Sequence, residues 1–233
     1  MAGNQSLDCD ICIIGAGSAG LSVAAGAAQL GVKTVLIERG EMGGDCLNVG
    51  CVPSKALIAA GRTAQEMREA GKFGIGAVEP EIDFAATLAH VANVIETIAP
   101  VDSQERFEGL GVTVIREDAR FADERTVLAG PWRITARRFV IATGSRPAVP
   151  PIPGLADVTY LTNEILFADR PRPEHLLIIG GGPIGVEMAQ AHRRLGSRVT
   201  VFEMDRILAR DDADLAAIVT ARLTEEGVVL KEG

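Results

Sequence analysis

The chain has 233 residues, of which 47% are hydrophobic and 23% charged, and its formal net charge is −8. These proportions are ordinary for a globular protein and exclude collagen and disorder, and the length suits one large or two modest domains. The acidic balance, without a Lys/Arg cluster, argues against a nucleic acid or an anionic membrane as partner. No apolar run reaches the ~18 residues of a membrane span. Since residues 1–8 also lack a signal-peptide pattern, we expect a cytoplasmic protein.

The first predicted elements are an apolar strand, Ile11–Ile14, a glycine-rich turn, a helical stretch, Ser18–Leu30, and a second strand that ends in Glu38. The first glycine of such a turn permits a sharp bend, the second lets a pyrophosphate approach the backbone, and the third lets helix and strand pack closely. The helix start offers free N–H groups to phosphates, and the acid accepts hydrogen bonds from a ribose. The three glycines are Gly15, Gly17 and Gly20.

Cys9 and Cys12 lie on or just before this first strand, where their C-x-x-C spacing resembles a redox motif. Strand residues three apart point to opposite faces of a sheet, whereas a thioredoxin-type pair opens a helix. We therefore interpret these two residues as thiols of the core or of a sheet edge.

A second cysteine pair, Cys46 and Cys51, follows a glycine loop in a stretch with a helical pattern from Cys46 to about Ala60. A disulfide at this spacing needs a distorted turn, which Gly50 and Pro53 are suited to provide. A helix start favours the thiolate and lowers the thiol pKa, so the pair has the features of a reversible redox disulfide. A metal site, which would want further Cys or His ligands, and two inert buried thiols are the alternatives.

The middle of the chain predicts a second helical stretch, Arg62–Ala70, a loop, Gly71–Pro80, and a long helix that Asp83 caps. This helix is expected to run to about Phe107, with a possible break at Pro100. Four prolines within residues 147–153 indicate an extended linker. Between helix and linker we expect short strands at Val112–Ile115, Ala119–Phe121, Arg125–Leu128, Trp132–Thr135 and Arg138–Ile141.

The first motif is repeated 165 positions later, over about 27 residues without a gap. A strand, Leu176–Ile179, precedes the second glycine turn, a helix spans Pro183–Leu195, and a strand ends in Glu203. A further helix from Asp211 or Asp212 to about Glu226 and a strand from Gly227 close the chain. The glycines of the second turn are Gly180, Gly182 and Gly185.

Two dinucleotide motifs in one chain favour a flavin and a nicotinamide that exchange electrons, although two ordinary strand–turn–helix units are the alternative. The predicted fold is α/β, with two Rossmann-like three-layer nucleotide-binding domains. Residues 1–148 would form the first segment of an FAD-binding domain with the redox disulfide. Residues 149–233 would form a truncated, incomplete NAD(P)-binding domain.

The segment Gly43–Lys55 resembles the active-site signature of the class I pyridine nucleotide–disulfide oxidoreductases, which include dihydrolipoamide dehydrogenase, glutathione reductase and mercuric reductase. Ala142–Ser145 resembles the family's second flavin motif, and Gly180–Glu187 resembles its nicotinamide motif. The resemblance covers essentially the whole chain, but members are about twice as long. Their C-terminal interface domain, with its His-Glu pair, has no counterpart here, so the chain resembles an N-terminal portion without a complete active site.

The resemblance implies that Cys51 is the charge-transfer thiol next to the flavin and that Cys46 attacks the disulfide substrate. Lys55 would place positive charge near the flavin, and Glu187 would pair with Lys55, the alternative being a solvent-facing carboxylate. Ala119 matches the position whose backbone meets the adenine. The residues expected to bind cofactors are Gly15, Gly17, Ser18, Gly20, Glu38, Arg39, Gly43, Gly44, Asp45, Cys46, Lys55, Ala119, Ala142, Thr143, Gly144, Gly180, Gly182, Pro183, Ile184, Gly185 and Glu203.

The implied activity is electron transfer between NAD(P)H, FAD and the cysteine pair, in a homodimer acting on a small-molecule or protein-bound disulfide. An acid at Glu203 favours NADH over NADPH, and Arg206 could soften that preference. Asp45 stands where many relatives carry Thr, and together with Val52 and Leu57 it makes the segment more similar to mercuric-reductase-like members than to glutathione reductase. Dihydrolipoamide is the expected substrate. A mercuric-reductase-like disulfide reductase and an inactive nucleotide-binding fragment are the alternatives, and no metal is expected.

Overall fold

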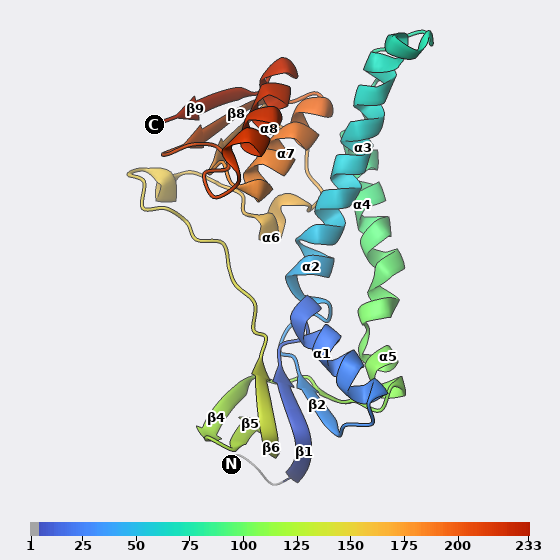
Figure 1. Ribbon diagram of the computed structural model, residues 1–233, viewed down its shortest axis with the longest axis vertical. Coiled ribbons are helices and arrows are strands. Elements are labelled where there is room, and N and C mark those ends of the chain that lie inside the picture. The colour runs from blue at the N-terminus through green and yellow to red at the C-terminus, as the bar shows by residue number, and fades with distance from the viewer. Residues whose placement is uncertain (1–4) are drawn as a thin grey trace. The chain divides into compact units, whose positions relative to one another are not determined.

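The computed structural model describes residues 5–233 and confirms the predicted α/β fold (Figure 1). Contacts group the chain into two compact units. The first unit comprises Met1–Val52 and Val94–Leu166, and the second comprises Pro53–Asn93 and Phe167–Gly233. This grouping shows where contacts concentrate, and the domain division expected between residues 148 and 149 stays a prediction.

The first unit contains a six-stranded sheet in the order β3-β2-β1-β6-β5-β4. The parallel pairs are β1 with β2, β1 with β6 and β2 with β3, whereas β4–β5 and β5–β6 are antiparallel. The carboxyl ends of the parallel strands therefore meet at one edge, where ligands of α/β sheets bind. The strands are β1 (Gln5–Ile14), β2 (Thr34–Ile37), β3 (Thr113–Ile115), β4 (Ala119–Asp123), β5 (Thr126–Ala129) and β6 (Trp132–Ile141).

Two hydrophobic clusters cover the two faces of this sheet. On one face, Leu36 packs with Leu21 of α1 (Ser18–Gln29) and Phe107 of α5 (Gln104–Gly109). On the other face, the excursion through β5 and β6 supplies Val127 and Ile134, both fully buried. The expectation of two strands between residues 132 and 141 is wrong, because β6 pairs with β1 along the whole of this stretch.

Strand β1 contains an irregularity that changes the positions of its cysteines. The amides of Asp10 and Ile11 both donate to the carbonyl of Lys33, at 2.9 and 3.3 Å, so the alternation of faces slips by one residue. Cys9 and Cys12 consequently join the same buried cluster. The expectation that they lie on opposite faces is wrong, but both are core thiols, and burial raises their pKa values to about 11 and about 12.

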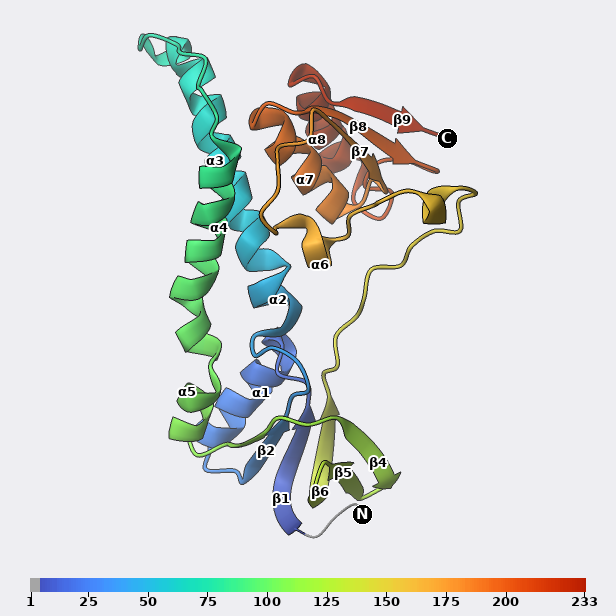
Figure 2. The same cartoon turned by 180° about the vertical axis from the view of Figure 1, so that it is seen from behind.

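The second unit contains a parallel sheet in the order β7-β8-β9 with helices α7 and α8 (Figure 2). Its core joins Val201 of the central strand to Ile207 and Leu223, all three fully buried. Asp212 caps α8 by accepting a hydrogen bond from the Asp214 amide at 3.0 Å. The elements are β7 (His175–Ile179), α7 (Pro183–Arg194), β8 (Arg198–Glu203), α8 (Ala213–Glu225) and β9 (Val229–Glu232).

Helices α3 (Cys51–Glu69) and α4 (Phe84–Ile98) lie side by side in both ribbon views. Asp83 caps α4 through the Ala86 amide, at 2.9 Å, as predicted. The single helix expected from Cys46 to about Ala60 is instead two helices, and α3 also absorbs the helix expected after Arg62. The remaining short helices are α2 (Gly44–Asn48), η1 (Ala70–Phe73), η2 (Ala99–Asp102), η3 (Leu155–Asp157) and α6 (Asn163–Leu166).

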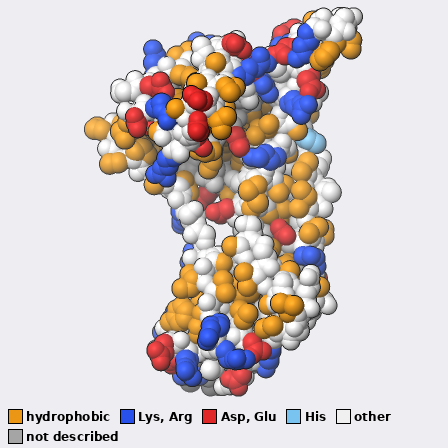
Figure 3. Space-filling model, in the orientation of Figure 1, with side chains coloured by type: hydrophobic (Ala, Val, Ile, Leu, Met, Phe, Trp, Pro, Cys, Tyr) orange, Lys and Arg blue, Asp and Glu red, His pale blue; other side chains and the backbone are white. Residues whose placement is uncertain are grey.

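Among residues 5–233, one helical stretch, Phe84–Gly109, is long and apolar enough to span a membrane by length and composition alone. Only 17% of the most apolar part of this stretch is buried. One such helix is weak evidence for a membrane span. On the face drawn in Figure 3, Lys and Arg side chains are interspersed with Asp and Glu side chains.

His192 of α7 is buried in the second unit, where its Nδ1 lies 2.9 Å from the carbonyl of Met188. Its Nε2 and the guanidinium nitrogens of Arg170 are buried and find no hydrogen-bond partner in the part of the chain that the structure describes. Burial, together with the positive charge of Arg170, lowers the pKa of His192 to about 4. The fold therefore holds this imidazole neutral.

We predict that His192 makes the protein less stable in acid. An unfolded His has a pKa of about 6.5, so the unfolded chain binds this proton first as the pH falls from 6.5 toward 4. The free energy of unfolding should decrease by up to about 3 kcal/mol across this window. In urea titrations followed by circular dichroism, His192→Leu should show a shallower pH dependence, and His90→Leu, at an exposed position of α4, should match the wild type. Parallel pH profiles for wild type and His192→Leu would contradict the prediction.

Candidate active site and nucleotide cavity

The first glycine turn connects β1 to α1 at the carboxyl edge of the sheet. Gly15 has φ +105, a conformation that favours glycine, and its amide donates to the carbonyl of Ile37 at 2.8 Å. A Cβ at Gly20 would lie 1.8 Å from the carbonyl oxygen of Gly15. The missing side chain therefore lets α1 start directly against the strand end.

Helix α1 presents a free N-terminus at this turn. Its N-cap, Gly17, makes no side-chain hydrogen bond, and the first turn of the helix contains no acid. Backbone N–H groups and the helix dipole are thus left for an anion, as a dinucleotide pyrophosphate requires.

Glu38, at the end of β2, lies next to the turn. Its carboxylate accepts hydrogen bonds from the amides of Ala16 and Gly40, both at 2.6 Å. These bonds fix the acid at the carboxyl edge of the sheet, where the sequence predicts a ribose contact.

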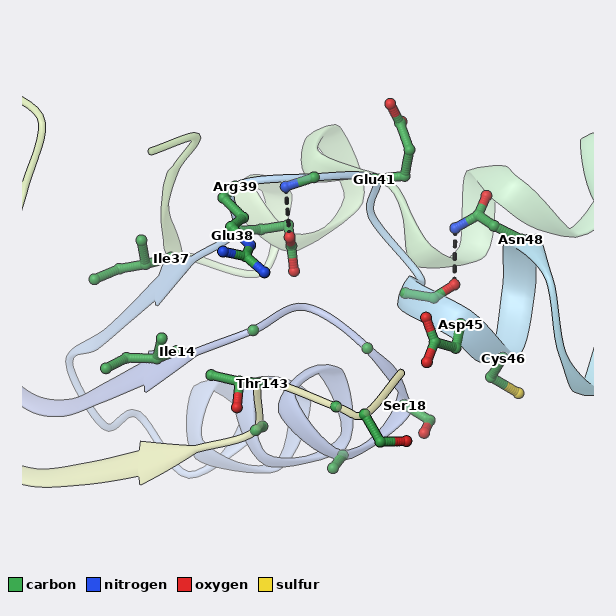
Figure 4. Close-up of a pocket in the computed structure, with 18 of the residues that line it drawn as sticks. Ile14, Ser18, Ile37, Glu38, Arg39, Glu41, Asp45, Cys46, Asn48 and Thr143 are labelled. Carbon is green, nitrogen blue, oxygen red and sulfur yellow. Dashed lines mark hydrogen bonds between the residues drawn. The ribbon is translucent and has the colours of Figure 1, made fainter. Parts of the chain in front are cut away.

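A cavity of about 780 Å³ opens over these elements within the first unit (Figure 4). Its volume falls in the range of small-molecule and cofactor sites. The cofactor residues predicted from the sequence that line it are Gly15, Gly17, Ser18, Glu38, Arg39, Gly44, Asp45, Cys46, Ala119, Ala142, Thr143 and Gly144.

Other predicted cofactor residues lie outside the cavity lining. Gly20 packs beneath the turn, and Gly43 forms the turn before α2, while Lys55 and the second glycine motif belong to the second unit. Several lining residues were not predicted, although most are sequence neighbours of predicted ones and could have been found that way. They are Ile14, Ala19, Ile37, Gly40, Glu41, Asn48, Val49, Glu117, Asp118, Ser145, Arg146 and Glu164.

The second motif repeats the first at the level of individual hydrogen bonds. Gly180 has φ +108, and a Cβ at Gly185 would lie 2.1 Å from the carbonyl oxygen of Gly180. The carboxylate of Glu203 accepts from the amides of Gly181 and Asp205, at 2.7 and 3.2 Å. Like α1, α7 begins without a side-chain cap or an acid in its first turn. The second unit therefore has the backbone features that a second dinucleotide requires.

The repeat extends beyond the stretch recognised in the sequence. In the first unit the amide of Gly43, with φ +83, donates to the carbonyl of Ala16 at 2.9 Å. The equivalent Leu208, with φ +55, donates to the carbonyl of Gly181 at 2.9 Å. Sequence comparison missed this match because glycine and leucine share no side-chain property, whereas the backbone conformation is the same.

The redox cysteines are separated by a break in the helix. Cys46 lies on α2, which ends at Asn48, and Cys51 starts α3. A Cβ at Gly50 would lie 2.7 Å from the carbonyl oxygen of Asp45, so only glycine fits the link between the helices. The distorted turn predicted between the two cysteines is therefore confirmed.

Both cysteines are in the reduced, dithiol form in this structure. Burial, followed by the hydrogen bond to Cys51, raises the pKa of Cys46 to about 11. The prediction of a lowered pKa is wrong for this residue, because desolvation and the second thiol outweigh the start of a five-residue helix. Within residues 5–233, no group of three His, Cys, Asp or Glu is placed to hold a metal ion.

Lys55 and Glu187 form an ion pair within the second unit, between α3 and the first turns of α7. The Nζ atom of Lys55 lies 2.8 Å from both carboxylate oxygens of Glu187. This agrees with the pairing that the family resemblance implies, whereas their catalytic roles stay predictions. Both side chains are partly exposed, at 60% and 36%, so the pair orients the ammonium group more than it stabilises the fold.

We predict that Gly20→Ala destabilises the protein by about 1–3 kcal/mol or more, because the new methyl group overlaps the carbonyl oxygen of Gly15. It should also weaken binding of adenine dinucleotides by displacing the start of α1. Gly26→Ala is the control in the same helix, since its Cβ would meet nothing within 4 Å. That change should stabilise the helix by about 0.5–1 kcal/mol. Equal unfolding midpoints for the two variants in urea would contradict this account of the turn.

Comparison with known proteins identifies the family of this chain. Residues 9–233 match the family described as pyridine nucleotide-disulphide oxidoreductase. A mercuric reductase of Streptomyces lividans is 37% identical over 227 residues, covering 95% of this chain and 48% of the relative. One of Shigella flexneri is 38% identical, covering 95% and 41%. The chain thus spans about half the length of the curated relatives it matches, or less.

Solved structures of a flavoprotein disulfide reductase also resemble the chain. The HOCl-induced flavoprotein disulfide reductase RclA from Escherichia coli superposes with a TM-score of 0.79 at 29% identity, covering 96% of this chain and 48% of that one. Its Cu(II) complex gives a TM-score of 0.77. The chain belongs to the pyridine nucleotide-disulphide oxidoreductase family.

Proposed function

We propose that the full-length protein is an FAD-dependent oxidoreductase that connects a nicotinamide nucleotide to the Cys46–Cys51 dithiol. One observation carries the proposal: Cys46 lines the same cavity as the glycine turn and the helix start suited to a pyrophosphate. A redox-active thiol and a dinucleotide site are thereby combined in one compact unit. Membership of the family supports the same reading.

The first unit fits FAD by the chemistry of its donors. The uncapped start of α1 and the side-chain-free Gly17 suit the pyrophosphate, and Glu38 suits the adenine ribose. Ala119 and Thr143 line the cavity as well and would contact the remaining parts of the ligand. When bound, FAD supplies a carrier for two electrons between a nicotinamide and a dithiol.

The chain's own side chains would then have separate tasks. Cys46 and Cys51 would alternate between dithiol and disulfide, and the constrained link at Gly50 would keep them close in both states. In the second unit, Glu187 would hold the Lys55 ammonium group in one orientation. We further propose a cytoplasmic homodimer, in which the second subunit would supply an acid–base pair to this site.

The substrate is proposed as a disulfide or a thiophilic metal ion. The curated relatives described above are named mercuric reductases, and the structural neighbour is named a disulfide reductase. These names favour the mercuric-reductase-like alternative over dihydrolipoamide. Both substrate types would react at the same place, because a dithiol reduces disulfides and binds soft metal ions.

We predict that NADH increases the number of titratable thiols in air-oxidised full-length protein by two. Cys46→Ser and Cys51→Ser should each abolish this increase, while Cys12→Ala, in the core, should retain it. NADH oxidation with lipoamide, oxidised glutathione and Hg(II) side by side would identify the substrate. An unchanged thiol increase in both active-site variants would overturn the proposed function.

A second prediction concerns the choice of nicotinamide. Glu203→Ala removes an acceptor for a ribose hydroxyl and also the repulsion of a 2′-phosphate. The KM for NADH should increase by about tenfold or more, as expected for the loss of a charge-assisted hydrogen bond. Use of NADPH should stay level or improve, since Arg206 follows in the same loop. An unchanged ratio of kcat/KM for the two nucleotides would show that the acid takes no part.

A further inference from the structure

Asp45 places a negative charge in the cavity, near the helix start that suits a diphosphate. It is the second residue of α2 and lines the cavity together with Gly17 and Ser18. A Cβ at Gly44 would lie 2.7 Å from the Cα of Gly17, so α2 starts directly against the glycine turn. The Asp45 carboxylate is therefore close to the helix start where a diphosphate would bind.

The Asp45 side chain points into the cavity and is not neutralised. Figure 4 shows its carboxylate directed into the space that the ligand would occupy. Within residues 5–233, this carboxylate makes no hydrogen bond or ion pair, and its Oδ2 lies 3.9 Å from the position of a Cβ at Gly144.

The other charged groups lining the cavity do not compensate for Asp45. The two arginines lie nearer to other acids than to Asp45 and form exposed ion pairs with them: Arg39 with Asp118 at 3.5 Å, and Arg146 with Glu164 at 3.7 Å. The Glu38 carboxylate is occupied by backbone amides. The remaining lining acids are Glu41, Asp45 and Glu117.

On these grounds we propose that Asp45 weakens the binding of diphosphate ligands to this cavity by like-charge repulsion, and so disfavours them relative to ligands without a diphosphate. The inference rests on the proposed function, in which the ligand is FAD. A diphosphate brings negative charge to the start of α1, and two anions at close range repel each other. The affinity for FAD is then the balance between the attraction of the helix start and the repulsion of one carboxylate.

The inference distinguishes Asp45 from Glu41, which lines the same cavity. Figure 4 shows the Glu41 side chain directed away from the ligand space, although it carries the same charge. Both residues are exposed and lie only four positions apart. Glu41→Gln is therefore a matched control for the loss of one negative charge at the cavity.

The test is the affinity of the full-length apoprotein for FAD, measured by quenching of flavin fluorescence. Asp45→Asn and Asp45→Thr should bind FAD about five- to tenfold more tightly than the wild type at low salt. The gain should shrink near 1 M salt, where the Debye length is about 3 Å. Glu41→Gln should stay within about twofold of the wild type, since its side chain points away from the ligand space.

A second measurement separates repulsion of phosphate from other effects on the cavity. ADP carries the diphosphate and adenosine does not, so Asp45→Asn should tighten ADP and leave adenosine unchanged in calorimetric titrations. Weaker FAD binding by Asp45→Asn would overturn the proposal and identify the carboxylate as an acceptor for ligand hydroxyls. Equal FAD affinities for wild type and variants would overturn it while leaving the proposed function intact. Failure of every form to bind FAD would overturn both.

Discussion

The close approach of a helix start to the end of a strand is the constraint on which both nucleotide motifs depend. In each unit a Cβ on the third glycine of the turn would overlap the carbonyl oxygen of the first, at 1.8 Å for Gly20 and 2.1 Å for Gly185. Without side chains at these positions, the uncapped amides of α1 and α7 reach the carboxyl edge of their sheets. The acid at the end of the next strand is then held by backbone amides of the same turn.

A second backbone constraint positions the redox chemistry. Gly50 fits against the carbonyl of Asp45 only because it has no Cβ, and this contact ends α2 and lets α3 begin at Cys51. A continuous helix would place residues five apart on different faces. The break brings the thiols into hydrogen-bonding range, at the expense of a high pKa for Cys46 while both are reduced. The reactivity of this pair therefore depends on nearby groups that lower the pKa of Cys46.

Charge has different roles in the two units. In the second unit, the buried Glu226 is bound by Arg194 and Arg222, whose guanidinium groups donate at 2.6 and 2.7 Å, and the network ties α7 to the end of α8. In the first unit, the cavity residue Asp45 has no such partner among the described residues, 5–233. Paired charges of this kind fix the packing of elements, whereas an unpaired carboxylate facing a ligand space affects what binds there.

The α/β fold, the duplicated glycine turns, the cap at Asp83 and the spacing of the cysteine pair could be predicted from the sequence, because each depends on local spacing and on residues with special backbone freedom. The choice of Asp212 over Asp211 as the cap of α8, and the features that follow, required the tertiary structure. The slip in β1 that places Cys9 and Cys12 in one cluster depends on the carbonyl of Lys33, and the continuous β6 depends on pairing with β1. The raised pKa of Cys46, the match of Gly43 with Leu208 and the orientation of Asp45 into the cavity likewise arise from contacts between segments. Spacing along a chain encodes local conformation, but burial, pairing register and side-chain direction are set by what packs against each residue.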